Sequence, residues 1–255
     1  MKKTVKGIYL IISSLVISVL HLPFAFAKTG SAKMLFARPA ISTAHPLPDS
    51  FFISPLKSVY DSLQLDLAGL SRRAYDYALQ GYEKLVNQGK LVNQSVLAIV
   101  DFSQPSSQKR LYVLDIKNYK VLFNTLVAHG RNSGKEWATY FSNKPSSYKS
   151  SPGFYITGQA YSGSNGYSLR LDGIEDGIND KAMKRAIVLH GADYVNESFI
   201  ATHGYIGRSE GCPAVPVRDA TNIINTIRDG VCLYIYTPDQ HYFSRSVILG
   251  EISRG

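Results

Sequence analysis

The chain has 255 residues and a formal net charge of +9 at pH 7. Its length is enough for one core of ordinary size with extensions. The lysines and arginines are scattered and form no block of like charge, so nucleic acid is not an expected partner. A mild positive charge of this kind fits an acidic cell-surface polymer better.

The first residues have the layout of a secretory signal peptide. Three lysines precede an apolar run at 8–20 that is too short to span a bilayer comfortably, and Ala25-Phe26-Ala27 fits a small-x-small cleavage site. We expect residues 1–27 to be removed and the protein to be exported, to the periplasm or to the cell wall or extracellular space, without stable membrane insertion. A retained membrane anchor is the alternative, and it fits the cleavage site less well.

The next two segments differ in pattern. Residues 28–57 are rich in proline and serine without periodicity, which predicts a linker or a loosely packed tail. Residues 58–92 carry apolar side chains at steps of three and four, which predicts a helical segment ending near Gly89. Gly69 and Gly81 allow two helices in place of one. The expected apolar stripe comprises Leu63, Leu67, Leu70, Ala74, Tyr77, Ala78 and Leu85.

From residue 96 the pattern changes to β-rich runs separated by polar turns. The runs 110–116 and 120–129 flank a short polar turn, which predicts a hairpin. Further strands are expected at 96–102, 153–161, 167–174, 186–192 and 231–237.

One late segment, 219–230, is expected to be a helix, because its isoleucines fall on one face and Gly230 ends it. Many strands and few helices predict a mainly β domain over residues 93–250, with a β-sandwich or barrel-like core and a few short helices. The N-terminal helical segment is expected to pack on or beside it.

The two cysteines have different surroundings. Cys212 lies in "GRSEGCPAV" between a glycine and a proline, whereas Cys232 lies in an apolar β-rich run and is expected to be buried. In an oxidising compartment the two thiols can form a disulfide, and the sequence alone leaves this open. Cys212 is otherwise a nucleophile or a metal ligand.

His190 ends the apolar run "AIVLH" 22 residues before Cys212. A histidine at the end of a strand is held in place, and a nearby imidazole lowers the pKa of a thiol. Such a pair carries out acyl transfer: sulfur attacks a carbonyl and the imidazolium protonates the leaving amine. Gly211 leaves the backbone open, so amides around it can donate to an oxyanion.

The sequence around this pair is more specific than the pair itself. "HG" at 190–191 after an apolar strand, followed by "SEGC" at 209–212, resembles the L,D-transpeptidase catalytic-domain family, whose enzymes remodel peptidoglycan. The likeness covers roughly residues 60 to 250 and extends to "VDFSQPSSQKRLYVLDI", "LVAHGRNSG", "FSNKPSSYKSSPGFY", "YSLRLDGIEDGIND" and "RAIVLHGADYV".

The resemblance implies a role for each residue of the motif. Cys212 would be the nucleophile and His190 its base, with the carbonyl of Gly191 orienting the imidazole. Ser209 and the amides near Gly211 and Cys212 would complete the oxyanion and orienting groups. No metal or cofactor is implied.

The resemblance also implies a reaction. The donor would be the tetrapeptide of a peptidoglycan stem, which loses its terminal D-alanine when the cysteine attacks the carbonyl of the diamino acid. A second stem's amine would then take the acyl group to give a 3→3 crosslink; with water instead, the enzyme is an L,D-carboxypeptidase. Carbapenems are expected to acylate the cysteine. A non-catalytic wall-binding protein is the remaining alternative, and the intact motif argues against it.

The sequence departs from the commonest family pattern in two ways. That pattern has an apolar residue and then arginine or asparagine after the cysteine, but here Pro213-Ala214-Val215 follows. Arg208, on the other side of the cysteine, is the expected substitute for gripping substrate. The spacing from residue 190 to 212 is also longer than usual, and both departures concern substrate choice more than chemistry.

Two other histidines have two interpretations each. His129, in a second strand-ending His-Gly, is either a substrate contact or base, or a polar cap at a strand end. His203, in the loop before Cys212, is either a substrate contact or a solvated loop residue.

Two metal sites are alternatives to a metal-free enzyme. One is a zinc site made of residue types that bind zinc: His190, Asp193, His203 and Cys212. Their spacing matches no metal motif, and a metallopeptidase is therefore kept only as the second candidate chemistry. "DGIEDGIND" spaces three aspartates, 172, 176 and 180, four apart without the order of an EF-hand loop. A turn running into a helix N-terminus explains these acids better.

Overall fold

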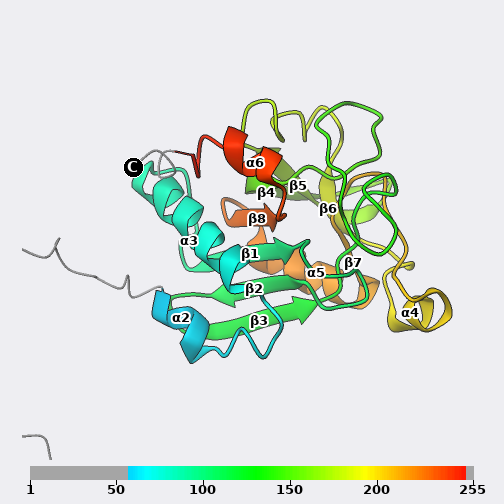
Figure 1. The fold of residues 1–255 in the computed structure, drawn as a ribbon, viewed down its shortest axis with the longest axis horizontal. Coiled ribbons are helices and arrows are strands. Elements are labelled where there is room, and N and C mark those ends of the chain that lie inside the picture. Colours follow the sequence, from blue (N-terminus) through cyan, green and yellow to red (C-terminus); the bar gives the residue numbers. More distant parts are fainter. Residues whose placement is uncertain (1–56, 251–255) are drawn as a thin grey trace, which may run out of the picture. The chain divides into compact units, whose positions relative to one another are not determined.

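The computed structural model describes residues 57–250, in which eight strands form a single sheet (Figure 1). The expected signal peptide and nearly all of the expected tail lie outside the described residues. Neighbouring strands follow the order β3-β2-β1-β8-β4-β5-β6-β7. The strands are β1 (Val96–Asp101), β2 (Leu111–Asp115), β3 (Lys120–Thr125), β4 (Gly153–Gly163), β5 (Gly166–Gly173), β6 (Val188–Gly191), β7 (Ala214–Val215) and β8 (Cys232–Tyr236).

The sheet nearly closes on itself. Strands β3 and β7 lie at its two ends. Just beyond β3, Ala128 pairs with Ala214 of β7 in an isolated antiparallel bridge, in which the Ala128 amide donates to the Ala214 carbonyl at 2.7 Å. A sheet that returns to its own first edge is barrel-like. The predicted mainly β fold and the predicted β2–β3 hairpin are both confirmed.

Both faces of the central strands are covered. All six residues of β1 are buried, because alternate side chains enter different apolar clusters. Leu97 and Ile99 belong to one cluster, and Ala98 and Val100 to the other. We call these the outer and inner clusters; the outer cluster also holds the N-terminal helices.

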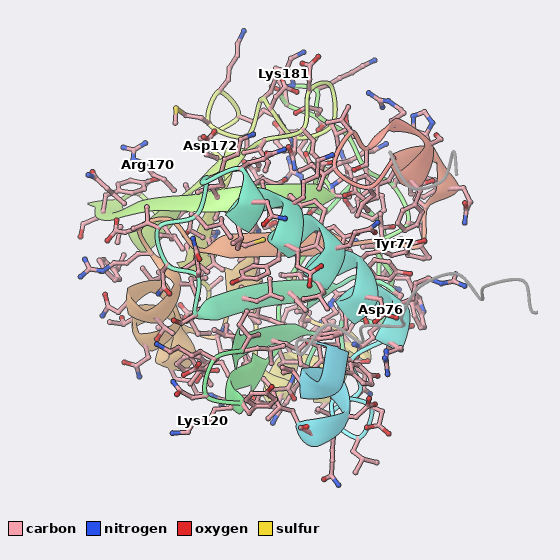
Figure 2. The ribbon with its side chains drawn as sticks, turned by 90° about the vertical axis from the view of Figure 1, so that its left-hand side faces the viewer. Asp76, Tyr77, Lys120, Arg170, Asp172 and Lys181 are labelled. Carbon is pink, nitrogen blue, oxygen red and sulfur yellow. The ribbon has the colours of Figure 1, made fainter. Side chains whose placement is uncertain are left out.

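Each cluster has its own helices. In the outer cluster, α3 (Arg72–Asn87) lies across β1 and β8, as Figure 2 shows from the side of this helix. In the inner cluster, α5 (Val217–Ile227) buries three isoleucines and contacts β6 and β5. The sequence predicts this helix correctly. It does not predict the short α4 (Glu197–His203), which has no buried residue, or α6 (Gln240–Arg245).

The N-terminal segment forms two helices, α2 (Lys57–Ser62) and α3. Gly69, with φ of +88°, lies in the turn between them, in a backbone conformation that favours glycine. Ser71 caps α3, because its hydroxyl accepts from the Ala74 amide at 3.4 Å.

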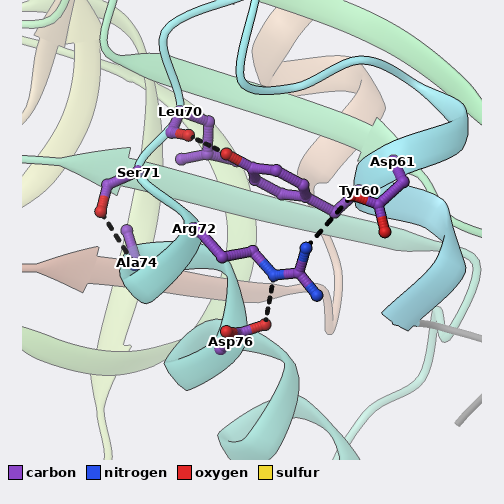
Figure 3. Close-up of polar contacts among 7 residues, drawn as sticks. All are labelled: Tyr60, Asp61, Leu70, Ser71, Arg72, Ala74 and Asp76. Atoms are coloured by element: carbon purple, nitrogen blue, oxygen red, sulfur yellow. Dashed lines mark hydrogen bonds and ion pairs between the residues drawn. The ribbon is translucent and has the colours of Figure 1, made fainter. Parts of the chain in front are cut away.

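Arg72 links the two helices (Figure 3). Its guanidinium contacts Asp61 on α2 at 3.2 Å and Asp76 one turn further along α3 at 3.1 Å. It also lies over the ring of Tyr60, whose hydroxyl donates to the Leu70 carbonyl at 2.6 Å. These contacts fix the angle at which the chain enters α3.

The expected apolar stripe is wrong in part. Leu67 is 78% exposed, because it lies in the turn and not on a helix. Within α3 the stripe is confirmed, because Ala74, Ala78 and Leu85 are buried; the buried face also includes Tyr75, Leu79 and Tyr82.

Gly81 allows close packing between α3 and the sheet. A Cβ atom at this position would lie 2.0 Å from Cζ of Phe154, a ring in the outer cluster. Although alanine favours a helix by about 1 kcal/mol over glycine, we expect Gly81→Ala to lower the free energy of unfolding by about 1–3 kcal/mol. Urea denaturation measures this change. Asn87→Ala, at an exposed position of the same helix, is the control, and an equal result for the two variants would contradict the prediction.

Candidate functional site

The candidate base lies inside the sheet. His190 pairs with Ser168 of β5 on one side and with Ala214 of β7 on the other, so its backbone is held from both directions. Its Nδ1 lies 2.9 Å from the Gly191 carbonyl. Since a carbonyl only accepts, Nδ1 carries the proton and Nε2 is left to accept one.

Gly191 makes room for helix α5. A Cβ atom there would lie 2.9 Å from Cβ of Ala220 and 3.2 Å from Cα of Val217. The glycine therefore lets the first turn of α5 pack against the strand that carries the histidine.

The candidate nucleophile lies in a tightly bonded turn. The Ser209 hydroxyl donates to the Cys212 carbonyl at 2.6 Å and accepts from the Gly211 amide at 3.0 Å. The Ser150 hydroxyl donates to the Gly211 carbonyl at 3.1 Å. Gly211 has φ of +125°, and a Cβ there would lie 2.8 Å from the Lys149 carbonyl, so both conformation and space require glycine.

These bonds bear on the expected oxyanion donors. The Gly211 amide is already engaged by Ser209. Within residues 57–250 the Cys212 amide donates to no other residue. The geometry therefore favours the amide of Cys212 over that of Gly211 as an oxyanion donor.

The thiol of Cys212 is 8% exposed. It donates to the Ala186 carbonyl at 3.7 Å and accepts from the Val188 amide at 3.5 Å. Burial raises the pKa of this thiol, and the Val188 amide and the Arg185 guanidinium offset only part of that effect.

Burial also lowers the pKa of His190, although the bond to Gly191 opposes this. Both shifts favour the neutral forms of the two groups. The direction for the thiol is opposite to the lowering expected from a nearby imidazole, because burial is the largest cause. His190, whose Nε2 is left to accept a proton, lines the same cavity as the Cys212 thiol.

Cys212 and His190 line one cavity of about 700 Å³. Three of its lining residues are arginines, and one is a glutamate. Arg131 and Glu210 are paired across it at 3.4 Å, and Arg131 also stacks on Tyr148 at 3.9 Å. The other lining residues are Ser146, Ser164, Asn165, Arg185, Ala186, Ile187, Tyr194, Arg208 and Ser209.

The structure places the three residues expected to contact substrate in different surroundings. Arg208 lines the cavity, and its guanidinium donates to the Gly134 carbonyl at 3.2 Å. His129 has no exposed surface, and its Nδ1 accepts from Arg110 at 2.8 Å. Burial and the charge of Arg110 lower the pKa of His129 to about 3, so its ring is neutral.

His203 lies on α4 and stacks on Phe199 at 4.1 Å. Like His129, it is not among the residues that line the cavity. We therefore carry a substrate role forward for Arg208 alone.

The two cysteines are both free. Cys232 belongs to the outer cluster and Cys212 to the inner one, so their side chains lie on opposite faces of the sheet. The disulfide that the sequence left open is not formed in this structure. Burial also raises the pKa of Cys232 far above that of an ordinary thiol, which makes it unreactive.

Neither metal alternative gains support. Across residues 57–250, no three His, Cys, Asp or Glu side chains are grouped to hold a metal ion, so the zinc set is not brought together. In "DGIEDGIND", Asp172 lies in β5, whereas Asp176 and Asp180 lie in a run of turns, so the expected helix start is wrong. The Asp180 carboxylate instead accepts from the Gly177 amide at 2.7 Å and from Asn143 at 2.6 Å.

The chain matches a known protein family. A family model described as "L,D-transpeptidase catalytic domain" matches residues 67–236. No curated protein matches the sequence. Among residues 57–250, no helix is long and apolar enough to cross a membrane.

Solved structures give distant matches. An L,D-transpeptidase from Mycobacterium smegmatis has 13% identity and a TM-score of 0.34, covering 56% of this chain and 59% of that one. L,D-transpeptidase 3 from Mycobacterium tuberculosis has 14% identity and a TM-score of 0.36, covering 56% and 61%. The helical cell shape determining protein Pgp2 from Campylobacter jejuni has 14% identity and a TM-score of 0.37, covering 57% and 49%. The chain thus spans less than two thirds of each of these proteins.

Proposed function

Because this chain belongs to the L,D-transpeptidase catalytic domain family, we propose that it is an exported, cysteine-dependent acyl-transfer enzyme that acts on peptidoglycan stem peptides. The observation that carries the proposal is the cavity shared by Cys212 and His190. The proton on Nδ1 of His190 supports it further, because Nε2 is then free to act as a base.

The first half of the reaction forms an acyl-enzyme. His190 Nε2 takes the thiol proton as the Cys212 sulfur bonds to the carbonyl carbon of the diamino acid, at its L-centre. The amide of Cys212 donates to the resulting oxyanion. The carbon–nitrogen bond to the terminal D-alanine then breaks, and the imidazolium returns its proton to the leaving amine.

The second half releases the acyl group. An amine from a second stem attacks the thioester, gives its proton to His190 and leaves the stem crosslinked, and the thiolate recovers its proton. With water as acceptor, the same steps yield a free carboxylate. Transfer to an amine and hydrolysis thus share every group of the site and differ only in the acceptor.

The charge of the cavity supports an anionic substrate. Three arginines line it, and the one glutamate, Glu210, is paired with Arg131. A stem peptide carries free carboxylates, which a net positive cavity attracts. Arg208, whose guanidinium donates to the Gly134 carbonyl and lies over the Tyr205 ring, is the proposed group that binds one of these carboxylates.

The test is a reaction with a defined tetrapeptide stem ending in D-alanine, in the presence and absence of a tripeptide acceptor. We expect release of free D-alanine, together with a crosslinked dimer when acceptor is present, both detected by mass spectrometry. Free tripeptide without dimer would assign the L,D-carboxypeptidase reaction. A substrate that stays intact under both conditions would overturn the proposal.

A further inference from the structure

Arg185 lies next to the turn that carries Cys212. It lines the cavity together with Cys212 and His190. Its Nη2 would lie 3.2 Å from a Cβ atom at Gly211, the residue before the cysteine. The sequence gives no separate signal for it, because it precedes β6 and is distant in the chain from the cysteine motif.

Four hydrogen bonds hold this guanidinium, and all four acceptors are neutral. Nη1 donates to the Ser142 carbonyl at 2.8 Å and to the Ser151 hydroxyl at 2.6 Å. Nη2 donates to the Lys149 carbonyl at 2.6 Å and to the Ser147 hydroxyl at 3.3 Å. Among residues 57–250 no carboxylate forms an ion pair with Arg185.

The positive charge of Arg185 acts on the groups around it, because no carboxylate among residues 57–250 pairs with it. Arg185 is half-buried, and screening by solvent is weaker there than on the surface. Its charge lowers the pKa of the Cys212 thiol, against the larger opposing effect of burial. Glu210 has the opposite influence on the thiol, but its carboxylate is exposed and paired with Arg131. The other titratable groups lining the cavity are Arg131, Tyr148, His190, Tyr194, Arg208 and Glu210.

We propose that Arg185 is a positioning residue for the nucleophile: its fixed charge stabilises the thiolate of Cys212, and its four bonds hold residues 142–151 against the cysteine turn. The inference rests on the proposed function only in taking Cys212 as the nucleophile. In this chain, the cation near the cysteine would come from the segment before β6, since Pro213-Ala214-Val215, and no arginine, directly follow the cysteine.

Alkylation by iodoacetamide tests the charge directly and needs no peptidoglycan. The thiolate displaces iodide to form a thioether, so the rate follows the thiolate fraction. We expect Arg185→Gln to move the pH midpoint for labelling of Cys212 upward by about one unit, measured by peptide mass spectrometry. Arg170→Gln, which removes a positive charge from β5 where Arg170 stacks on Tyr161, is the matched control and should leave the midpoint unchanged.

A second variant keeps the arginine and cancels its charge. Ser147 is half-buried and already accepts from Nη2, so Ser147→Asp places a carboxylate beside the guanidinium. We expect the midpoint to rise in this variant as well, whether or not Arg185→Gln folds. Arg185→Lys keeps the charge and should restore most of the original midpoint.

The outcomes separate this inference from the proposed function. A folded Arg185→Gln or Ser147→Asp protein with the midpoint of the original chain would overturn the role of Arg185, whatever the enzyme does to stem peptides. A shifted midpoint in an enzyme that leaves stem peptides intact would support Arg185 and count only against the substrate.

Discussion

Replacing Cys212 with alanine should abolish covalent acylation by a carbapenem, whereas replacing Cys232 with alanine should leave it intact. The reason is the position of each thiol. Cys212 lines the cavity with the candidate base, whereas Cys232 is fully buried in the outer cluster. Intact-mass spectrometry of each protein, with and without the drug, measures the addition of one drug molecule.

The same substitution should lower turnover of a tetrapeptide stem by about three orders of magnitude or more, because no other group at the site can form the acyl-enzyme. The Ala186 carbonyl and the Val188 amide lose only weak contacts with sulfur, so the variant should unfold at nearly the same urea concentration as the original chain. An adduct that persists in a folded Cys212→Ala protein would remove Cys212 from the mechanism. An adduct lost in Cys232→Ala alone would move the reaction to the other thiol.

The two residues of the proposed catalytic pair both lie where the chain has little freedom. His190 ends a strand with neighbours on both sides, and Cys212 lies in a turn whose glycine is required by space and conformation. The pair alone is a weak signal, and the surrounding sequence, which resembles the L,D-transpeptidase family, is what indicates these positions. The near closure of the sheet then brings both residues to one cavity.

The remaining parts of the site depend on contacts between distant segments. Ser150 bonds to Gly211 across 61 positions of the chain, and Arg185 bonds to residues 34–43 positions away. No local periodicity reports such contacts. The sequence offers the amides of both Gly211 and Cys212 as oxyanion donors, and only the folded turn shows that Ser209 engages the Gly211 amide.

Burial, an interrupting turn and short element length explain the remaining differences between the sequence predictions and the structure. The sequence shows that His129 follows a strand, but only the structure shows that its ring is enclosed and bonded to Arg110. Likewise, the apolar stripe failed at Leu67 because a turn interrupts the helix there. Short elements such as β7, α4 and α6 have too few residues for a periodicity to appear.

Arg110 supports the largest predicted effect on stability. It has no exposed surface, and its guanidinium donates to the Val127 carbonyl at 3.0 and 3.2 Å, to the Gln104 carbonyl at 2.8 Å and to Nδ1 of His129. It also lies over the ring of Phe102 at 4.7 Å. Methionine has a similar length but no donor, so Arg110→Met removes the donor from the buried Val127 carbonyl, from the buried ring nitrogen of His129 and from the half-buried Gln104 carbonyl.

We expect Arg110→Met to lower the free energy of unfolding by about 2–5 kcal/mol, because each buried acceptor left without a donor costs about 1–3 kcal/mol. Urea denaturation measures it, with Arg228→Met as the matched control. Arg228 is half-exposed and paired only with its neighbour Asp229, so its loss should change stability by less than about 0.5 kcal/mol. Equal midpoints for the two variants would contradict the structural role of Arg110.

The effect should also reach the proposed active site. The carbonyl of His129, the residue that Arg110 holds, accepts from the Ser209 amide at 3.0 Å, and Ser209 in turn bonds to the Cys212 carbonyl. If Arg110 fixes this chain of contacts, then Arg110→Met should lower the rate of carbapenem acylation even at temperatures where the protein remains folded. An unchanged acylation rate in a destabilised but folded variant would confine Arg110 to stability and leave the cysteine turn to be held by Ser150 and Arg185.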